Sequence, residues 1–349
     1  MKSENIMLLE DFELIKLSGI EWSFFSNKTI FVTGANGFLP AYMIETLLTL
    51  NESVLLESPC KVIALVRNKI HTESRFSKYL GDKNFIIVIQ DVSHEILINE
   101  KIDFIIHAAS SASPKYYDDD PVGVIMPNII GTKNTLELGI KNDIESYLYF
   151  SSGEVYGQLP DNQTIDENSY GYLDPISVRA CYGESKKMGE NICISYGYQF
   201  DMPVKIVRPF HTYGPGMKLD DGRVFADFVK NIVNSENIEL KSDGSAVRAF
   251  CYLADATIAF FKVLLEGKKN NAYNVANPEC LTTIKELANI LVNLYPEKKL
   301  TATFAEQSKN YIQSPVKGNK VDISKLKALG WEPKISIPDG FKKTIGSYK

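Results

Sequence analysis

Cysteine and histidine are scarce in this sequence, and neither occurs in a spacing that is typical of a metal site. The 349 residues include five cysteines and four histidines, with no C-x-x-C pair and no H-x-x-x-H pair among them. We therefore expect reduced, buried thiols in a cytoplasmic protein, and we predict no metal site. The acidic run 118–120 directly precedes Pro121, which is typical of a solvated loop and the start of a helix.

Long apolar runs and basic blocks are also missing. No apolar stretch approaches the roughly 20 residues that a membrane-spanning helix needs. Acidic residues exceed basic ones by 43 to 38, giving a formal charge of −5, and no basic cluster could follow a nucleic acid backbone. We therefore expect neither a membrane nor a nucleic acid as a partner, and an anionic ligand must be bound by local Arg and Lys side chains.

Short apolar runs do recur along the chain and alternate with helical stretches. Continuous apolar strands in this arrangement predict a parallel sheet covered by helices on both faces. The expected fold is α/β, a Rossmann-type doubly wound parallel sheet with a smaller C-terminal α/β substrate-binding lobe. The predicted strands of the sheet are 28–32, 61–66, 85–89, 103–107, 147–150 and 204–207.

Three regions are expected along the chain. Residues 1–28 mix acidic and apolar side chains unlike a secretory signal, and they predict an amphipathic helix packed on the surface. Residues 29–210 form the dinucleotide-binding domain, and 211–349 form mainly the lobe for the substrate. A segment of about 250–280 returns to the first domain through a strand at 272–276. Helices of the lobe region are expected at 225–234, 254–265 and 283–294.

The segment 33–40 (TGANGFLP) follows the first predicted strand and is typical of a nucleotide-phosphate loop. Gly34 allows a tight turn, and Gly37 allows backbone N–H groups to approach a pyrophosphate. Pro40 stands where a third glycine is usual, which the first turn of a helix tolerates. The expected cofactor contacts in this loop are Gly34, Asn36, Gly37, Phe38 and Leu39.

Two further segments, 151–157 (SSGEVYG) and 180–186 (ACYGESK), carry the groups for acid–base chemistry. On a helix, Tyr182 and Lys186 lie on one face a turn apart. The neighbouring ammonium favours the phenolate, so Tyr182 could accept a proton from a sugar hydroxyl near neutral pH. A hydroxyl at either Ser151 or Ser152 could share that proton. A base for an alcohol beside a dinucleotide site indicates hydride transfer.

Taken together, these segments resemble the extended short-chain dehydrogenase/reductase superfamily, in its NAD-dependent epimerase/dehydratase family. The resemblance runs in order from about residue 29 to about residue 346. Within the family it is closest to the UDP-glucuronate decarboxylases. The stretches that carry this finer resemblance are 107–114 (HAASSASP), 175–182 (PISVRACY), 213–224 (YGPGMKLDDGRV) and 247–252 (VRAFCY).

The resemblance implies a catalytic set of Ser152, Glu154, Tyr182 and Lys186. The 4,6-dehydratases carry an acidic Asp at the position of Gly153, whereas the decarboxylases keep only the Glu. The implied reaction is therefore decarboxylation of UDP-glucuronate to UDP-xylose through transient oxidation at C4. The alternatives are a nucleotide-sugar 4-epimerase, then a 4,6-dehydratase or an NADPH-dependent ketosugar reductase, and last a non-catalytic binding protein on the same fold.

The implied cofactor is NAD⁺. However, Arg67 stands where NAD-selective relatives place an Asp, and it would suit the 2′-phosphate of NADP⁺ or an ordinary surface position equally well. Asn128 either holds backbone geometry near the site or caps a helix. Outside the glycine loop, the implied cofactor contacts are Arg67, Asp91, Val92, Ala108, Ala109, Ser110, Asn128, Tyr182, Lys186 and Pro209.

The implied substrate is a nucleotide sugar, with a UDP-sugar favoured. Arg223 and Arg248 are expected to clamp its diphosphate, because guanidinium groups bind phosphate oxygens in pairs. Arg179 would face the sugar carboxylate or pair with a local acid, and Tyr117 would hydrogen-bond the sugar. His211 and Gly216 depart from the family's Asn and Arg. The implied substrate contacts are Pro114, Tyr117, Ser152, Glu154, Arg179, Tyr182, His211, Arg223, Val224 and Arg248.

Relatives dimerise by packing two helices per subunit into a four-helix bundle. The corresponding segments here are approximately 122–138 and 182–196. The resemblance therefore implies a homodimer.

Overall fold

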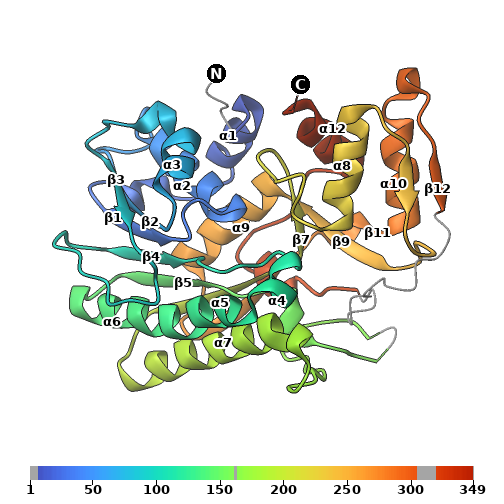
Figure 1. Cartoon of the computed structure of the whole chain (residues 1–349). Coiled ribbons are helices and arrows are strands. Elements are labelled where there is room, and N and C mark those ends of the chain that lie inside the picture. Colours follow the sequence, from blue (N-terminus) through green and yellow to red (C-terminus); the bar gives the residue numbers. More distant parts are fainter. Residues whose placement is uncertain (1–6, 161–162, 305–319, 349) are drawn as a thin grey trace.

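The computed structural model describes residues 7–160, 163–304 and 320–348, so the first six residues of the predicted N-terminal extension lie outside it. Its centre is a sheet of seven parallel strands (Figure 1). The predicted fold class is confirmed, and each strand foreseen in the sequence is present to within about two residues. From one edge to the other the strands are β10 (Asn271–Val275), β6 (Val204–Pro209), β5 (Ser146–Phe150), β4 (Phe104–His107), β1 (Thr29–Thr33), β2 (Lys61–Val66) and β3 (Phe85–Ile89).

Alternate residues of each central strand point to opposite faces of the sheet, and both faces are buried. Ile30 and Val32 of β1 belong to the larger hydrophobic cluster, whereas Phe31 between them belongs to the cluster on the other face. This double burial explains why the strands are continuous apolar runs without polar alternation. The strand expected at 272–276 is β10, which pairs in parallel with β6.

Helices cover both faces. Above the sheet in Figure 1 lie α1 (Leu9–Lys16), α2 (Phe38–Leu50), α3 (Lys69–Arg75) and α9 (Leu253–Glu266). Below it lie α4 (Lys115–Asp119), α5 (Pro121–Met126), α6 (Thr132–Asn142) and α7 (Cys181–Gln199). Within the described residues, no helix is both long enough and apolar enough to span a membrane.

The remaining elements form the smaller part of the molecule, on the right of Figure 1. One small sheet joins β7 (His211–Tyr213), β9 (Val247–Tyr252) and β11 (Leu281–Thr283). A second pairs β8 (Ile238–Leu240) with β12 (Ala302–Phe304). The helices here are α8 (Val224–Asn234), α10 (Ile284–Asn293), α11 (Ser324–Lys327) and α12 (Ile337–Gly346).

The helix expected at 122–138 is not one regular helix. It consists of α5, a π-helical turn η3 (Pro127–Gly131) and α6. Pro127 has no N–H to donate and its ring crowds the preceding turn, so the helix widens at this point. Of the acidic run before it, Asp118 and Asp119 lie in the short helix α4 and not in a loop, so that part of the prediction is wrong. The predicted helix start is confirmed, since the side chain of Asp120 caps α5 by accepting from Gly123 N at 3.0 Å.

Candidate active site

The candidate residues gather where the parallel strands end. Strands β1, β4, β5 and β6 are neighbours in the sheet. Their carboxyl ends therefore bring the glycine loop, residues 108–110, residues 151–156 and Pro209 to the same edge, the usual position of a ligand site in an open α/β sheet.

The glycine loop passes very close to the end of β4. Gly34 has φ +62°, and a Cβ added there would lie 2.6 Å from Ala109 Cα, so no larger residue fits without a shift of the backbone. The N–H of Gly37 closes the turn onto Gly34 O at 2.7 Å. Helix α2 begins at Phe38, and Pro40 therefore lies in its first turn, where no internal hydrogen bond is lost.

The loop and its surroundings fit a dinucleotide. Helix α2 begins directly after this loop and has no side-chain cap at its N-terminus, and such a helix start is suited to binding a pyrophosphate. Two polar atoms beside it, Asn36 Oδ1 and Ser110 Oγ, are buried and have no hydrogen-bond partner among the residues that the structure describes. Such atoms are stabilised when a ligand supplies the missing partner.

At the end of β2, the guanidinium of Arg67 extends toward the end of β3. Its Nη1 lies 3.8 Å from Asp91 Oδ2, and its side chain is 63% exposed. An ion pair this long and this exposed is weak, so Arg67 could turn to another anion. Val92, next to Asp91, is buried.

Tyr182 and Lys186 lie a turn apart on α7, both buried. Burial raises the pKa of Tyr182 to about 12, against the opposing effects of a hydrogen bond with Ser152 and the charge of Arg223. Burial lowers the pKa of Lys186 to about 7. Lys186 Nζ donates to Phe150 O at 2.6 Å. Burial therefore dominates the pKa of Tyr182 in this structure, and activation of its phenol by the Lys186 ammonium stays a prediction.

The structure separates the two candidate serines. The Ser152 hydroxyl faces Tyr182 and lowers its pKa, and Ser152 Oγ accepts a hydrogen bond from Glu154 N at 3.2 Å. Ser151 points the other way and donates to the carboxylate of Glu190. Ser152 is thus the hydroxyl beside the candidate base.

Tyr117, Arg179 and Glu154 form a layer over the candidate base. The rings of Tyr117 and Tyr182 stack with centroids 5.4 Å apart, and the guanidinium of Arg179 lies 4.7 Å from the Tyr117 ring. Arg179 also pairs with Glu154 at 3.6 Å, so of its two expected roles the structure provides the local acid. The Tyr117 hydroxyl donates to Ala112 O at 3.0 Å, so its hydrogen is already used within the protein.

The expected diphosphate clamp lies on the other side of the site. Arg223 donates through Nε to Asp221 Oδ2 at 2.7 Å, so its charge is partly balanced within the chain. Arg248 Nη1 donates to Val247 O at 2.8 Å. Burial, and then the charges of both arginines, hold the pKa of His211 well below the usual range. Its Nδ1 is buried and has no hydrogen-bond partner within the described part of the chain. Pro114 precedes α4, and Val224 opens α8.

Asn128 lies inside the π-helical turn η3, so the alternative that it caps a helix is wrong. It is fully buried, and its amide nitrogen donates to Ser185 Oγ at 2.9 Å and to Val124 O at 3.0 Å. It therefore ties η3 to helix α7 on the side of the candidate base.

Two charged residues beneath the site were missed by the sequence prediction. Glu190 follows Lys186 by one turn of α7, and it pairs with Arg208 of β6 at 2.7 Å. The repeat of Tyr182, Lys186 and Glu190 at every fourth residue was the available signal. Arg208, the partner of Glu190, could not be identified from the sequence, because it lies on strand β6 and not on α7.

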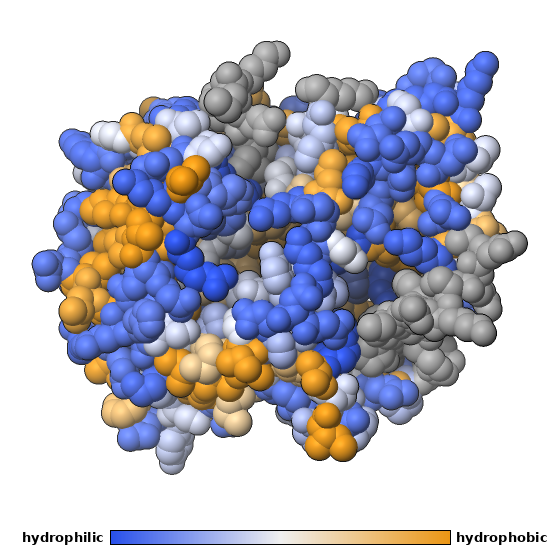
Figure 2. Space-filling model, in the orientation of Figure 1, coloured by the Kyte–Doolittle hydropathy of each residue, from blue (hydrophilic) through white to orange (hydrophobic). Residues whose placement is uncertain are grey.

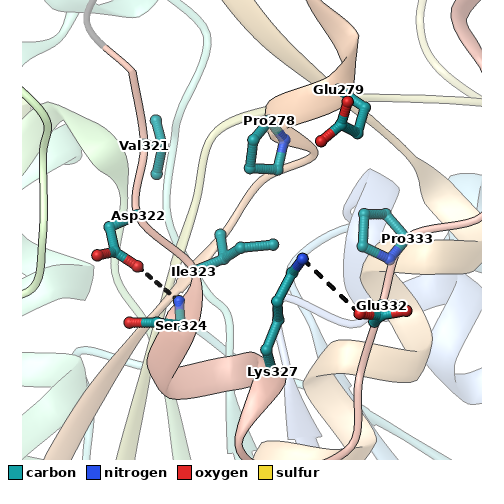
Figure 3. A pocket seen from close by; sticks show the side chains of 9 residues that line it. All are labelled: Pro278, Glu279, Val321, Asp322, Ile323, Ser324, Lys327, Glu332 and Pro333. Atoms are coloured by element: carbon teal, nitrogen blue, oxygen red, sulfur yellow. Dashed lines mark hydrogen bonds and ion pairs between the residues drawn. The ribbon is translucent and has the colours of Figure 1, made fainter.

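A separate hollow is shown in Figure 3. It has a volume of about 410 Å³ and lies by α11, against Pro278 and Glu279. Lys327 pairs there with Glu332 at 3.7 Å, and none of the predicted site residues lines it. In the described part of the chain, no cluster of three or more His, Cys, Asp or Glu side chains could hold a metal ion.

The fold and this site define a dinucleotide-dependent enzyme of the short-chain dehydrogenase/reductase type, with a Tyr–Lys pair beside a glycine loop. The chain belongs to the NAD dependent epimerase/dehydratase family, whose model matches residues 30–276. It is an NAD(P)-dependent nucleotide-sugar enzyme of the extended type.

Similar proteins include UDP-glucuronic acid decarboxylase 6 of Arabidopsis thaliana, 33% identical over 321 residues that cover 91% of this chain and 88% of the relative. UDP-glucuronic acid decarboxylase 1 of Danio rerio is 31% identical over 91% of this chain and 72% of its own. Among solved structures, UDP-glucose 4-epimerase of Thermotoga maritima superposes with a TM-score of 0.77 at 23% identity, over 92% of this chain and 98% of that one. UDP-glucuronic acid 4-epimerase of Bacillus cereus, solved with UDP-glucuronic acid and NAD, superposes with a TM-score of 0.72 at 21% identity, over 92% of this chain and 98% of that one.

Proposed function

We propose that this protein decarboxylates UDP-glucuronate to UDP-xylose. The observation that carries the proposal is the site layer in which Glu154 is present, Arg179 lies 3.6 Å from it, and Gly153 replaces the acid that a 4,6-dehydratase needs. Relatives named UDP-glucuronic acid decarboxylase, 33% identical over 91% of the chain, support it. A cationic guanidinium at the sugar site suits a substrate that carries a carboxylate.

In the proposed mechanism, Tyr182 removes the proton of the 4-hydroxyl while Ser152 hydrogen-bonds to the same oxygen. Bound NAD(P)⁺ supplies reversible hydride acceptance at C4. The 4-ketone is then β to the C5 carboxylate, so carbon dioxide leaves and the bonding electrons form an enolate. Arg179 orients the carboxylate before it leaves, and a proton is delivered to C5 from the side of Glu154. Tyr182 returns its proton as the ketone is reduced.

The cofactor that we propose is NAD⁺, held by the glycine loop and by residues 108–110. Arg67 keeps NADP⁺ as the alternative, because its exposed guanidinium lies 3.8 Å from Asp91 and could contact a 2′-phosphate. Because the hydride returns to the sugar, the cofactor is regenerated in each cycle and is expected to stay bound. Binding of NAD⁺ and NADP⁺ to the cofactor-stripped protein, measured by calorimetry, distinguishes the two.

Proton NMR of the full-length protein with UDP-glucuronate, without added cofactor, tests the proposal. New xylose-type anomeric signals with release of carbon dioxide are expected. Formation of UDP-galacturonate would instead identify the 4-epimerase, and reaction only with added NADPH would identify the reductase. No reaction would contradict the proposal, and a panel of UDP-, CDP-, GDP- and dTDP-sugars would then identify the substrate.

A 4-epimerase is the second candidate. It needs the same oxidation at C4 but no acid at position 153, so Gly153 fits it as well. The two reactions differ in what happens to the 4-ketone: loss of the carboxylate or rotation before reduction. The guanidinium of Arg179, 3.6 Å from Glu154, could bind the sugar carboxylate in either reaction on UDP-glucuronate. The relatives named UDP-glucuronic acid decarboxylase favour the decarboxylase.

We also propose that the protein is a homodimer through α5, α6 and α7, and that residues 211–349 supply most of the nucleotide-sugar contacts. A hollow of about 450 Å³ lies between α5, α7 and the segment before α7. Figure 2 shows apolar side chains gathered over the region of α5. Ile176, Val178 and Met188 line this hollow and are exposed, and Val122 and Met126 of α5 are exposed apolar residues as well.

A further inference from the structure

In addition to the contact between Ser152 and Tyr182, two hydrogen bonds connect the end of β5 to one face of α7. The carbonyl of Phe150 accepts a hydrogen bond from Lys186 Nζ at 2.6 Å. The next residue, Ser151, donates its hydroxyl to the carboxylate of Glu190. Three consecutive residues of β5 and its following loop thus meet three residues spaced by one turn along α7.

Glu190 is held in place by an ion pair with Arg208 of β6, the strand that pairs with β5. Arg208 Nε and Nη2 donate to the two carboxylate oxygens at 2.8 and 2.7 Å. The side chains are only 9% and 12% exposed. The remaining nitrogen, Nη1, donates to Tyr156 OH at 2.9 Å and to Glu167 O at 2.9 Å.

The physical cost of burying these charges makes the network rigid. A buried carboxylate or guanidinium is strongly destabilising unless nearly every hydrogen bond is satisfied, and breaking one partner of such a pair leaves the other charge uncompensated. Here both carboxylate oxygens of Glu190 and all three nitrogens of Arg208 have partners. The network joins β6, α7 and the loop 151–156, so it determines how that loop lies against the helix.

We propose that Glu190, clamped by Arg208, is a positioning residue of the active site. It holds the loop 151–156 and Lys186 in the arrangement that proton transfer at Tyr182 requires. The reaction in which Glu190 would assist rests on the proposed function. Its role in holding the loop 151–156 and Lys186 in place does not.

The carboxylate of Glu190 also acts on Lys186 through its charge. Burial lowers the pKa of Lys186 to about 7, and Glu190 opposes that shift. Loss of the Glu190 charge therefore lowers the pKa further, and the ammonium is lost at a lower pH. Activity that depends on the ammonium then falls at a lower pH on the alkaline side. The titratable groups that face Lys186 come from α7, β5 and β4: Glu190, Cys193, Tyr182, Tyr149 and His107.

The test is Glu190→Gln in the full-length protein, read in two ways. ¹³C-lysine NMR follows the titration of Lys186, assigned with Lys186→Arg, and needs no substrate. The titration midpoint is expected to fall by about one pH unit. With the nucleotide sugar that the wild type converts, kcat should drop at least about tenfold while KM stays within about threefold. The alkaline limb of the pH dependence of kcat should move to lower pH, as the Lys186 midpoint does.

Two further variants separate positioning from folding. Glu266→Gln removes the partner of the buried Lys262 in a single-contact ion pair on α9, away from the site, in which Glu266 is 39% exposed. It should change neither the Lys186 titration nor the pH profile. Arg208→Lys keeps the charge of Glu190 but loses the two-point contact, so kcat should fall with little change in the Lys186 midpoint.

An unchanged Lys186 titration in Glu190→Gln, or a kcat that falls only with the folded fraction, would overturn the proposal. If Glu190→Gln does not fold, an Arg208→Lys protein with wild-type kcat would overturn it as well. If the wild type converts no nucleotide sugar, the proposed function is wrong, and the Lys186 titration alone decides the positioning role.

Discussion

At the scale of single residues, the site contains two titratable groups whose pKa values are displaced in opposite directions. Burial raises the pKa of Tyr182 to about 12 and lowers that of Lys186 to about 7. Groups with displaced pKa values that meet in one cleft are typical of acid–base catalysis. The stacking of Tyr117 on Tyr182 fixes the phenol without using its oxygen.

Substitution of the candidate base provides the first prediction at this scale. Tyr182→Phe should lower the rate of sugar conversion by about 10²–10⁴-fold, which is the usual contribution of general acid–base catalysis. The ring can still stack on Tyr117, so calorimetric binding of UDP should stay within about threefold of the wild type. Conversion at the wild-type rate, followed by proton NMR, would show that Tyr182 is not the base.

The glycine loop gives a second prediction. Gly34→Ala places a Cβ 2.6 Å from Ala109 Cα at a φ of +62°, so we expect it to lower the free energy of unfolding by about 2–4 kcal/mol. Gly19→Ala is the matched control, since Gly19 has φ +73° but open space around its Cβ. Gly19→Ala should lower the free energy of unfolding by only about 1 kcal/mol. Urea unfolding of both variants measures the difference, and equal losses would mean that the close approach to Ala109 has no cost.

At the scale of elements, helix α1 is attached to three other parts of the molecule through one buried carboxylate. Asp11 is fully buried. It accepts hydrogen bonds from Tyr42 of α2 at 2.9 Å, from Tyr252 of β9 at 2.6 Å and from Lys343 of α12 at 3.0 Å. The sequence pattern predicted only an amphipathic helix packed on the surface, with no separate role for Asp11. Instead, it anchors α1 between the dinucleotide domain and the C-terminal elements.

This anchor predicts an asymmetry between adjacent acidic residues. Asp11→Ala leaves two buried phenol hydroxyls without their acceptor and removes the buried one of the two acidic partners of Lys343. We expect it to lower the free energy of unfolding by about 3 kcal/mol. Glu10→Ala should change it by less than about 0.5 kcal/mol, because the Glu10 side chain is 79% exposed and its pair with Lys343 is solvated. Urea unfolding tests both, and a similar loss in the two variants would mean that Asp11 is no anchor.

At the scale of the whole molecule, the exposed apolar surface over α5 and α7 bears on assembly. We expect light scattering at micromolar concentration to give the mass of a dimer. Met188→Glu, on a side chain that is 49% exposed, should yield a monomer, because the interface would have to bury an unpaired charge. Leu97→Glu, at an exposed apolar residue away from these helices, should leave the dimer intact. A monomeric wild type would contradict the proposed dimer.

Much of the fold and part of the site could be predicted because they depend on local pattern. Apolar runs marked the strands β1 to β6 and the returning β10. The turn at Gly34 and the spacing of Tyr182 and Lys186 are set by neighbouring residues along the chain. Conversely, the break at Pro127 was missed because a proline can begin, end or widen a helix, and packing against α7 selects among these outcomes.

By itself, the sequence determined the α/β class, the glycine loop and the identity of the catalytic candidates, since short-range sterics and hydrophobic periodicity act within one element. Only the tertiary structure decided which groups meet. It turned Ser152 toward Tyr182 and Ser151 toward Glu190, and it paired Arg179 with Glu154. These contacts join elements far apart in the sequence, and their geometry depends on which strands end side by side. The shifted pKa values of Tyr182 and Lys186 depend on the same packing, because these side chains are buried only in the folded chain.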